Sequence, residues 1–195
     1  SKSYDMGEQM RINAFDWGAE FGEIMWNGGF DGVIGNPPYI RIQALKEWAP
    51  LEVEFYKQRY RAAGKGNYDI YVVFVEKALG LLNGRGRMGF ILPHKFFNAQ
   101  YGEPLRGLIA EGKHLTEIVH FGEQQIFNSA TTYTCLMFLN KHAQDQFQFI
   151  KVDDLGAWQR DEDVDSGFLL AENIGSADWN FTIDDNAPVL ARLKL

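Results

Sequence analysis

Short apolar runs separated by longer mixed segments predict that this chain builds a sheet flanked by helices. Residues 30–35 (FDGVIG) are mostly apolar and stop at two prolines, so they predict a buried parallel strand that ends in a rigid loop. Residues 68–82 carry apolar side chains on all sides, and their length favours a helix packed on that sheet. Residues 83–86 (NGRG) interrupt the pattern, and residues 87–93 (RMGFILP) predict the next buried strand.

The same alternation continues beyond this strand. Residues 101–111 predict a helix, residues 115–121 a strand, and residues 131–139 (TTYTCLMFL) a β-branched and aromatic strand. The order strand, helix, strand, helix, strand, strand predicts an α/β fold with a doubly wound, Rossmann-like sheet. The last two strands are adjacent in sequence and are therefore expected to pair antiparallel. After Lys141 the helical periodicity stops, and residues 147–195 suggest the opening of a second, β-rich or irregular domain.

Composition narrows the class of protein. The 195 residues are 46% hydrophobic and 14% aromatic, enough for a domain with a core. A single cysteine excludes a disulfide framework and a cysteine-rich zinc site, and it favours a reducing compartment such as the cytoplasm. The four histidines show no metal-ligand spacing, so no metal is expected. The sequence contains neither about 18 consecutive apolar residues nor a signal-peptide layout, so no membrane is expected.

Charge adds one candidate surface. A formal net charge of -7 argues against a simple nucleic-acid coat, because phosphate binding depends on clustered Lys and Arg. Four basic residues nevertheless lie close together in the middle of the chain: Lys57, Arg59, Arg61 and Lys65. They are candidate DNA-binding residues that would contact phosphates, and a solvated helix face explains them equally well.

The strongest chemical signal is the tetrapeptide Asn36-Pro37-Pro38-Tyr39, which directly follows the first predicted strand. Ligands of doubly wound sheets bind at the carboxyl ends of strands, so a site is expected at this loop. The exocyclic amino group of a base is a poor nucleophile, because its lone pair is delocalised into the ring. The Asn36 side-chain oxygen and the Pro37 carbonyl oxygen would accept its two N–H bonds, held in place by the prolines. Tyr39 would provide a flat surface for an extruded base; the alternative is a proline-rich turn with a packed tyrosine.

Two other motifs suggest different chemistry and are better explained structurally. Residues 84–89 (GRGRMG) match GxGxxG, but they follow a predicted helix and open a strand, whereas a dinucleotide-binding loop follows a strand and opens a helix. We interpret them as a plain turn. Cys135 lies inside a predicted strand and not in a Pro-Cys loop, so we expect a buried core thiol and not the nucleophile of cytosine-C5 methylation.

Three segments in order resemble successive motifs of one enzyme family. They are FDGVIGNPPYIR (30–41), NYDIYVVFVEKALGLLNGRGRMGFILPHKFF (67–97) and GEQQIFNSATTYTCLMFL (122–139). The family is the gamma class of DNA adenine-N6 methyltransferases, which includes the Taq-type and type IIG restriction-modification enzymes. The similarity covers roughly residues 14–141.

The resemblance implies a reaction and a set of site residues. The reaction is methyl transfer from S-adenosylmethionine to the N6 amino group of a flipped adenine in double-stranded DNA. Asn36, Pro37, Pro38 and Tyr39 would be the catalytic loop, and Phe127 would pack against the opposite face of the adenine from Tyr39. The cofactor would contact Asp16, Asn36 and Tyr71.

The family's glycine-rich cofactor loop has no counterpart in residues 1–15. We therefore expect residues 1–143 to be the C-terminal part of a catalytic domain, with a partial methyltransferase sheet, and residues 144–195 to start a target-recognition or linker region. The remaining domains of the parent polypeptide would be partners, and the fragment alone would be inactive.

Other functions fit the same loop. Enzymes that methylate a protein glutamine or a guanine of ribosomal RNA also use an Asn-Pro-Pro-Tyr loop after a strand. Cytosine-N4 enzymes usually carry Ser in place of Asn36, which disfavours them. A non-catalytic DNA-binding module that keeps the fold is the remaining alternative.

Overall fold

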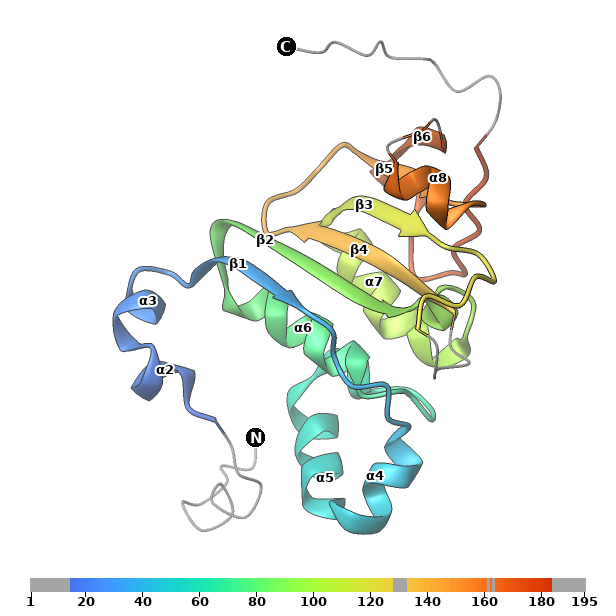
Figure 1. Cartoon of the computed structure of the whole chain (residues 1–195). Helices are drawn as coiled ribbons and strands as arrows, with labels where there is room; N and C mark the ends of the chain where they lie inside the picture. The colour runs from blue at the N-terminus through green and yellow to red at the C-terminus, as the bar shows by residue number, and fades with distance from the viewer. Residues whose placement is uncertain (1–14, 128–132, 161, 163, 184–195) are drawn as a thin grey trace.

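The computed structural model describes residues 15–127, 133–160, 162 and 164–183, and it contains a six-stranded sheet with the order β1-β2-β4-β3-β5-β6 (Figure 1). The strands are β1 Phe30–Gly35, β2 Leu82–Pro93, β3 Leu115–His120, β4 Thr134–Asn140, β5 Gln146–Lys151 and β6 Asp165–Leu170. β1 pairs with β2 in parallel, and β4 pairs antiparallel with both β2 and β3. These pairings confirm the predicted α/β sheet and the antiparallel pairing of the two strands that are adjacent in sequence.

The described α-helices precede β1 or lie between β1 and β2, between β2 and β3, and between β5 and β6. The α-helices are α2 Trp17–Glu20, α3 Gly22–Trp26, α4 Ile42–Trp48, α5 Pro50–Arg59, α6 Tyr71–Leu81, α7 Glu103–Glu111 and α8 Leu155–Gln159. Short 3-10 turns are η1 Arg61–Ala63, η2 His94–Phe97, η3 Gln100–Gly102 and η4 Ala171–Asn173. Among the described residues, no helix is long and apolar enough to cross a bilayer.

The main core lies between the sheet and the helices α6 and α7, which cover the same face of it (Figure 1). Side chains of β2 and β4 that alternate along each strand point into this core, as the period of two in a strand requires. Its largest fully buried members include Tyr71, Leu92, Phe96, Leu105 and Met137. Burial of each such side chain contributes roughly 1.5–3 kcal/mol, which fixes the helices against the sheet.

A smaller core covers the opposite face of the sheet near β3. Val119, Phe121 and Val152 are buried there, and Leu155 and Trp158 of α8 pack against them. The Trp158 ring meets the Phe121 ring edge-on at 5.4 Å between centroids. α8 therefore covers the sheet only at its β3 and β5 side.

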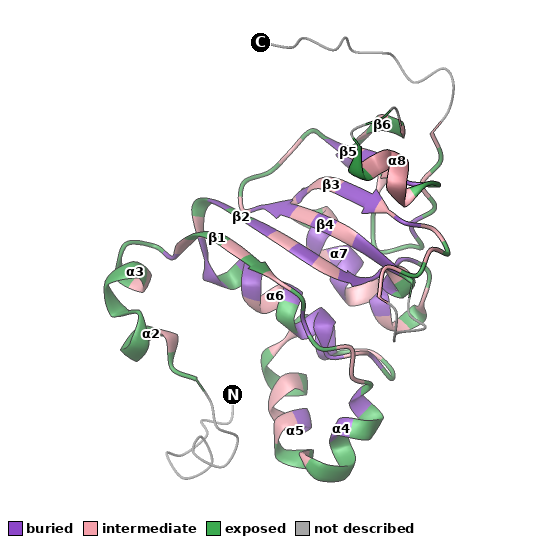
Figure 2. Cartoon of the chain, viewed as in Figure 1, coloured by how far each residue is buried: buried purple, intermediate pink, exposed green. Residues whose placement is uncertain are grey.

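The first strand differs from its predicted environment. β1 is parallel, as expected, but it is an edge strand bonded only to β2 in the described sheet, and its side chains are largely accessible (Figure 2). Ile34 is 91% exposed, because no helix of the described residues covers this face beside β1. The prediction of a buried strand was therefore wrong on burial and correct on position and direction.

The chain beyond residue 143 continues the same sheet. β5 pairs with β3 in parallel, and β6 pairs with β5 antiparallel. β5 and β6 are thus hydrogen-bonded into the sheet that the earlier residues form. The division of the chain into two regions near residue 144 remains a prediction. The acidic residues Asp161 and Asp163 and the segment 184–195 lie outside the described residues.

Candidate functional site

Three chain segments meet at one edge of the sheet. β1 and β2 run parallel and end at the same edge, and the antiparallel strand β4 begins there, because Pro93 pairs with Thr134. The loop after β1, the turn η2 after β2 and Tyr133 just before β4 are thereby brought together. This is the carboxyl edge at which α/β sheets place their ligands.

An open cleft of about 620 Å³ lies at this edge. It is lined by Tyr39, Arg41, Asp69, Pro93, His94, Lys95, Asn98, Ala99 and Tyr133. The cleft brings the aromatic residue of the Asn-Pro-Pro-Tyr loop together with cations, a carboxylate and a second tyrosine. Its volume lies in the range of a small-molecule or nucleotide site.

The loop presents one polar side chain to solvent and holds one aromatic ring. Asn36 is exposed, and none of the described residues forms a hydrogen bond with its side chain, whereas Pro37 is buried. Tyr39 is half-buried, and its hydroxyl donates to the carbonyl oxygen of Ile91 at 3.1 Å. Burial raises the pKa of Tyr39 to about 12, so its phenol stays neutral at physiological pH.

Backbone pairing fixes the exit of the loop. The amide of Ile70 donates to the carbonyl oxygen of Ile40 at 2.8 Å, and the amide of Ile42 donates to the carbonyl oxygen of Tyr68 at 2.9 Å. Between these two bonds, Arg41 and Asp69 form an isolated antiparallel bridge. The loop is therefore tied to the segment that starts α6.

A chain of hydroxyl groups leads from the core to the cleft. Tyr71 is completely buried, and its hydroxyl lies 3.0 Å from the hydroxyl of Tyr101. Tyr101 in turn donates to Asp69 Oδ2 at 3.1 Å. Burial raises the pKa of both tyrosines, that of Tyr101 to about 12. Tyr71, predicted to contact the cofactor, thus reaches the cleft only through Tyr101 and Asp69.

Two histidines lie at the ends of their strands. His94 follows β2 and lines the cleft, whereas His120 ends β3 behind it, with the two ring centroids 4.3 Å apart. The ring of Tyr133 stacks near that of His94 at 15° and 6.3 Å between centroids. Burial lowers the pKa of both histidines, that of His120 to about 4, so both are neutral at pH 7.

Two predicted residues lie away from the cleft. The Asp16 carboxylate caps α2 by accepting from the amides of Gly18 at 2.9 Å and Ala19 at 3.1 Å. The following residue, Trp17, contacts Phe30 at the start of β1, the opposite end of that strand from Asn36. Phe127 is half-buried and is not among the described residues that line the cleft; residues 128–132 after it lie outside the described part of the chain.

The four basic residues predicted to contact DNA also lie outside the cleft. Arg61 forms a bidentate ion pair with Glu111 at 2.5 Å for each bond, and Lys65 pairs with Glu103. Lys57 and Arg59 lie exposed in the last turn of α5. Two of the four cations therefore already have a carboxylate partner within the chain.

The interpretation of Cys135 as a buried core thiol is confirmed, whereas the interpretation of residues 84–89 as a plain turn is wrong, because these residues form part of strand β2. Cys135 is completely buried in β4, and burial raises the pKa of its thiol. The GRGRMG segment follows α6 and lies in β2, so a helix leads into it and a strand contains it. It falls where the pairing register jumps from Phe30 opposite Leu82 to Gly32 opposite Arg87.

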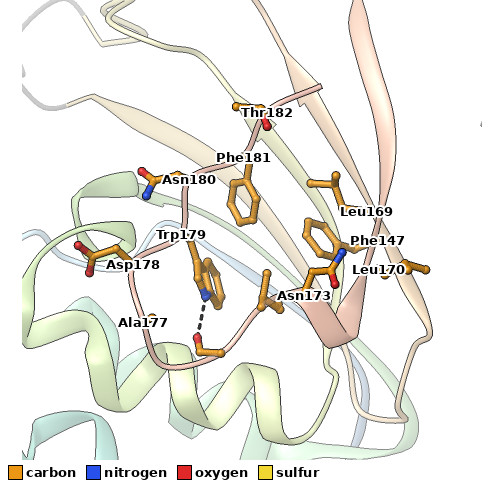
Figure 3. Close-up of a pocket in the computed structure, with 12 residues that line it drawn as sticks. Phe147, Leu169, Leu170, Asn173, Ala177, Asp178, Trp179, Asn180, Phe181 and Thr182 are labelled. Carbon is orange, nitrogen blue, oxygen red and sulfur yellow. Dashed lines mark hydrogen bonds between the residues drawn. The ribbon is translucent and has the colours of Figure 1, made fainter. Parts of the chain in front are cut away.

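A second cavity of about 230 Å³ lies between β5, β6 and the segment after η4 (Figure 3). Phe147, Leu169, Trp179 and Phe181 form apolar walls, and the Trp179 indole donates to the Gly175 carbonyl oxygen at 2.8 Å. No residue predicted from the sequence to act in the site lines this cavity.

Sequence reasoning missed Arg41, Lys95 and Tyr133. The signal was available, because Lys95 lies two residues after the strand RMGFILP, and Asn36 lies directly after FDGVIG. The rule that ligands bind at the carboxyl ends of strands applies equally to both. Tyr133 could be placed only once β4 was known to start at that edge.

The fold is similar to those of two solved restriction-modification proteins. The described structure superimposes on the methyltransferase subunit of a type I restriction-modification system from Streptococcus thermophilus with a TM-score of 0.54, at 20% identity, covering 74% of this chain and 35% of that one. It also superimposes on the type IIL restriction-modification enzyme MmeI, solved in complex with DNA, with a TM-score of 0.54, at 14% identity, covering 72% and 19%. At these identities the likenesses establish the fold alone.

The chain belongs to the Eco57I restriction-modification methylase family, whose family model matches residues 3–127. It is 38% identical over 152 residues to the type II restriction enzyme and methyltransferase RM.Eco57I of Escherichia coli. That match covers 78% of this chain and 14% of the relative. The family expected from the sequence motifs is therefore confirmed, and the chain spans a small part of the relative's length.

Proposed function

We propose that this chain carries the base-binding part of an enzyme that transfers a methyl group from S-adenosylmethionine to the N6 amino group of a flipped adenine in DNA. The enzyme would act in a restriction-modification system. The observation that carries this proposal is the Asn36-Pro37-Pro38-Tyr39 loop at the carboxyl end of β1, with Tyr39 in the wall of an open cleft.

The loop supplies acceptors that a weak amine needs. The exposed Asn36 amide has no partner among the described residues, so its oxygen is available to accept an N–H bond, as is the carbonyl oxygen of the rigid Pro37. Two such bonds favour a tetrahedral nitrogen whose lone pair points away from the ring. Preorganised acceptors of this kind act mainly on the transition state.

The aromatic ring of Tyr39 provides the stacking surface. Its hydroxyl bond to Ile91 and its edge-on contact with Tyr71, at 6.4 Å between centroids, hold the ring against the sheet. A base entering the cleft would stack on a ring that is already ordered, so little conformational entropy is lost on binding. Phe127 remains our candidate for the opposite face.

The described residues fit part of a cofactor site. Asn36 is an exposed polar side chain at the carboxyl end of β1, able to contact S-adenosylmethionine, which supplies the methyl group when bound. Asp16 caps α2 near the opposite end of β1 and therefore does not join Asn36 in this part of the site. Tyr71 is buried, so we propose that it acts by holding Tyr101 and, through it, the Asp69 carboxylate at the cleft.

Methyl transfer by the full-length protein tests the proposal. Protein is incubated with methyl-tritiated cofactor and duplex DNA of mixed sequence, and the DNA is digested to nucleosides. We expect label in N6-methyladenine with wild type and a loss of about 100-fold or more in Asn36→Ala, comparable to removal of one preorganised bond in other enzymes. Asn180→Ala, which removes an exposed amide outside the cleft, is the matched control and should retain activity.

The distribution of label decides between the alternatives. Label in a protein glutamine or in RNA would replace the DNA proposal by one of the other enzymes with this loop. DNA binding without transfer to any acceptor would favour the non-catalytic module. Label in N4-methylcytosine would overturn the base assignment alone.

A further inference from the structure

We propose that Arg41 and Lys95 bind the backbone phosphates beside the nucleotide that enters the cleft. The inference rests on the proposed function, because it takes DNA as the occupant. Both residues line the cleft that Tyr39 walls. They come from different segments, one just after the Asn-Pro-Pro-Tyr loop and the other in η2 after β2.

These two cations differ from the other basic residues near them. Both side chains are exposed, and neither forms an ion pair or a hydrogen bond with any described residue. Arg61 and Lys65, by contrast, are paired with Glu111 and Glu103. In a chain with 26 acidic and 19 basic residues, cations that line a cleft without forming an ion pair with any described residue are available to an anionic ligand.

The backbones that carry them are fixed in different ways. Arg41 is held by its bridge to Asp69 and by the amide bonds on either side of it. The buried Arg106 side chain anchors η2: its guanidinium donates to the carbonyl oxygens of Phe96 at 2.6 Å and Ala99 at 2.9 Å. Both cations therefore extend from ordered backbone, so less conformational entropy opposes their binding to a phosphate.

The charges inside the cleft direct the ligand. The carboxylate of Asp69 accepts from the Tyr101 hydroxyl and would repel a phosphate, so the backbone of the nucleic acid belongs with the two cations. The aromatic rings of Tyr39, His94 and Tyr133 remain for the base and the sugar. Phosphate contacts of this kind position a nucleic acid without reading its sequence.

The salt dependence of DNA binding tests the proposal. The affinity of the full-length protein for a fluorescent duplex is measured from 50 to 250 mM salt for wild type, Arg41→Ala, Lys95→Ala and Arg85→Ala. Each lost phosphate contact lowers the slope of log affinity against log salt by about 0.9. We expect that decrease in the first two variants and none in the third. Arg85 lies exposed in the first part of β2, far from the carboxyl edge, and loses the same charge.

Further variants distinguish the loss of a phosphate contact from disturbed folding. Their results, read together with the methyl-transfer assay, also distinguish the phosphate proposal from the proposed methyl acceptor. Arg41→Lys and Lys95→Arg keep the charge and should restore the slope, whereas a slope that stays low would indicate disturbed folding and overturn the proposal. An unchanged slope in both alanine variants would also overturn it, even if wild type methylates adenine. A decrease confined to these variants, with no label in adenine, would support the phosphate contacts and contradict the proposed methyl acceptor.

Discussion

The hydroxyl group of Tyr39 donates a 3.1 Å hydrogen bond to the carbonyl oxygen of Ile91, linking the end of the Asn-Pro-Pro-Tyr loop to the neighbouring strand β2. Gly35, the last residue of β1, pairs with Phe90, the residue before Ile91. The loop that follows β1 is therefore bonded to the neighbouring strand β2 through the Tyr39 side chain before the chain continues into α4. The sheet therefore positions the aromatic ring of Tyr39, and this residue forms part of the cleft wall.

Substitution of Tyr39 separates the roles of its hydroxyl and its ring. Tyr39→Phe removes the bond to Ile91 and should lower the free energy of unfolding by about 1 kcal/mol, while methyl transfer falls less than tenfold. Tyr39→Ala also removes the stacking surface, worth about 1–3 kcal/mol per base, and should lower transfer by roughly 10- to 100-fold more. Urea unfolding and tritium transfer measure the two effects. Equal losses of transfer in both variants would contradict the stacking role.

Arg106 anchors the segment that carries Lys95 from the protein interior. It is 2% exposed; besides its bonds to Phe96 and Ala99, it donates to the Ser176 carbonyl oxygen at 2.9 Å and pairs with Asp178 at 3.0 Å. Arg106→Met leaves several acceptors unpaired and should lower the free energy of unfolding by about 3 kcal/mol. Arg160→Met, which breaks an exposed pair with Glu162, should leave the urea midpoint almost unchanged. Equal shifts in urea midpoint would contradict the anchoring role.

Much of the sheet could be predicted from the sequence because its strands are bounded by strong local signals. The run FDGVIG ends at two prolines and forms β1 over Phe30–Gly35, the residues that the pattern predicted. Helix α7 begins two residues later than predicted, because residues 100–102 form a 3-10 turn. Burial of β1 was not predictable, since it depends on which elements cover each face of the sheet. A local apolar pattern does not contain that information.

The candidate site was predictable only where it is contiguous in sequence. Asn36 through Tyr39 form one tetrapeptide, and a strand-end rule located them. Lys95 and Tyr133 join Tyr39 only through the pairing of β2 with β1 and β4. The four basic residues at 57–65 were predicted to bind DNA because they lie close together in the sequence. The pairing of Arg61 with Glu111 joins residues 50 positions apart, so no local pattern reveals it.

Two glycines give a matched test of local packing. A Cβ at Gly102 would collide with the carbonyl oxygen of Phe96, whereas a Cβ at Gly80 in α6 would meet nothing within 4 Å. Gly102→Ala should lower the free energy of unfolding by about 1–3 kcal/mol, because η2 must move. Gly80→Ala should raise it by about 0.5–1 kcal/mol, because alanine favours the helix. Urea titration measures both, and a stabilised Gly102→Ala would contradict the tight contact.

His120 should make stability depend on pH in the mildly acidic range. Burial, with His94 and Lys151 nearby, lowers its pKa to about 4, below the ordinary value of about 6.5. Between these values the unfolded chain binds a proton that the folded chain does not, so the stabilisation present above pH 6.5 is lost as pH falls towards 4.

Urea unfolding at pH 7.5, 6 and 5 measures this loss. His120→Gln keeps a polar side chain without the titration, and it should lose about 1 kcal/mol less than wild type between pH 7.5 and 5, a value reduced for the partial exposure of the ring. His94 and His114, whose pKa values are also lowered by burial, remain in the variant and leave a residual slope of the same sign. Identical pH profiles for wild type and variant would show that the pKa of His120 is the same in the folded and the unfolded chain, which would contradict this prediction.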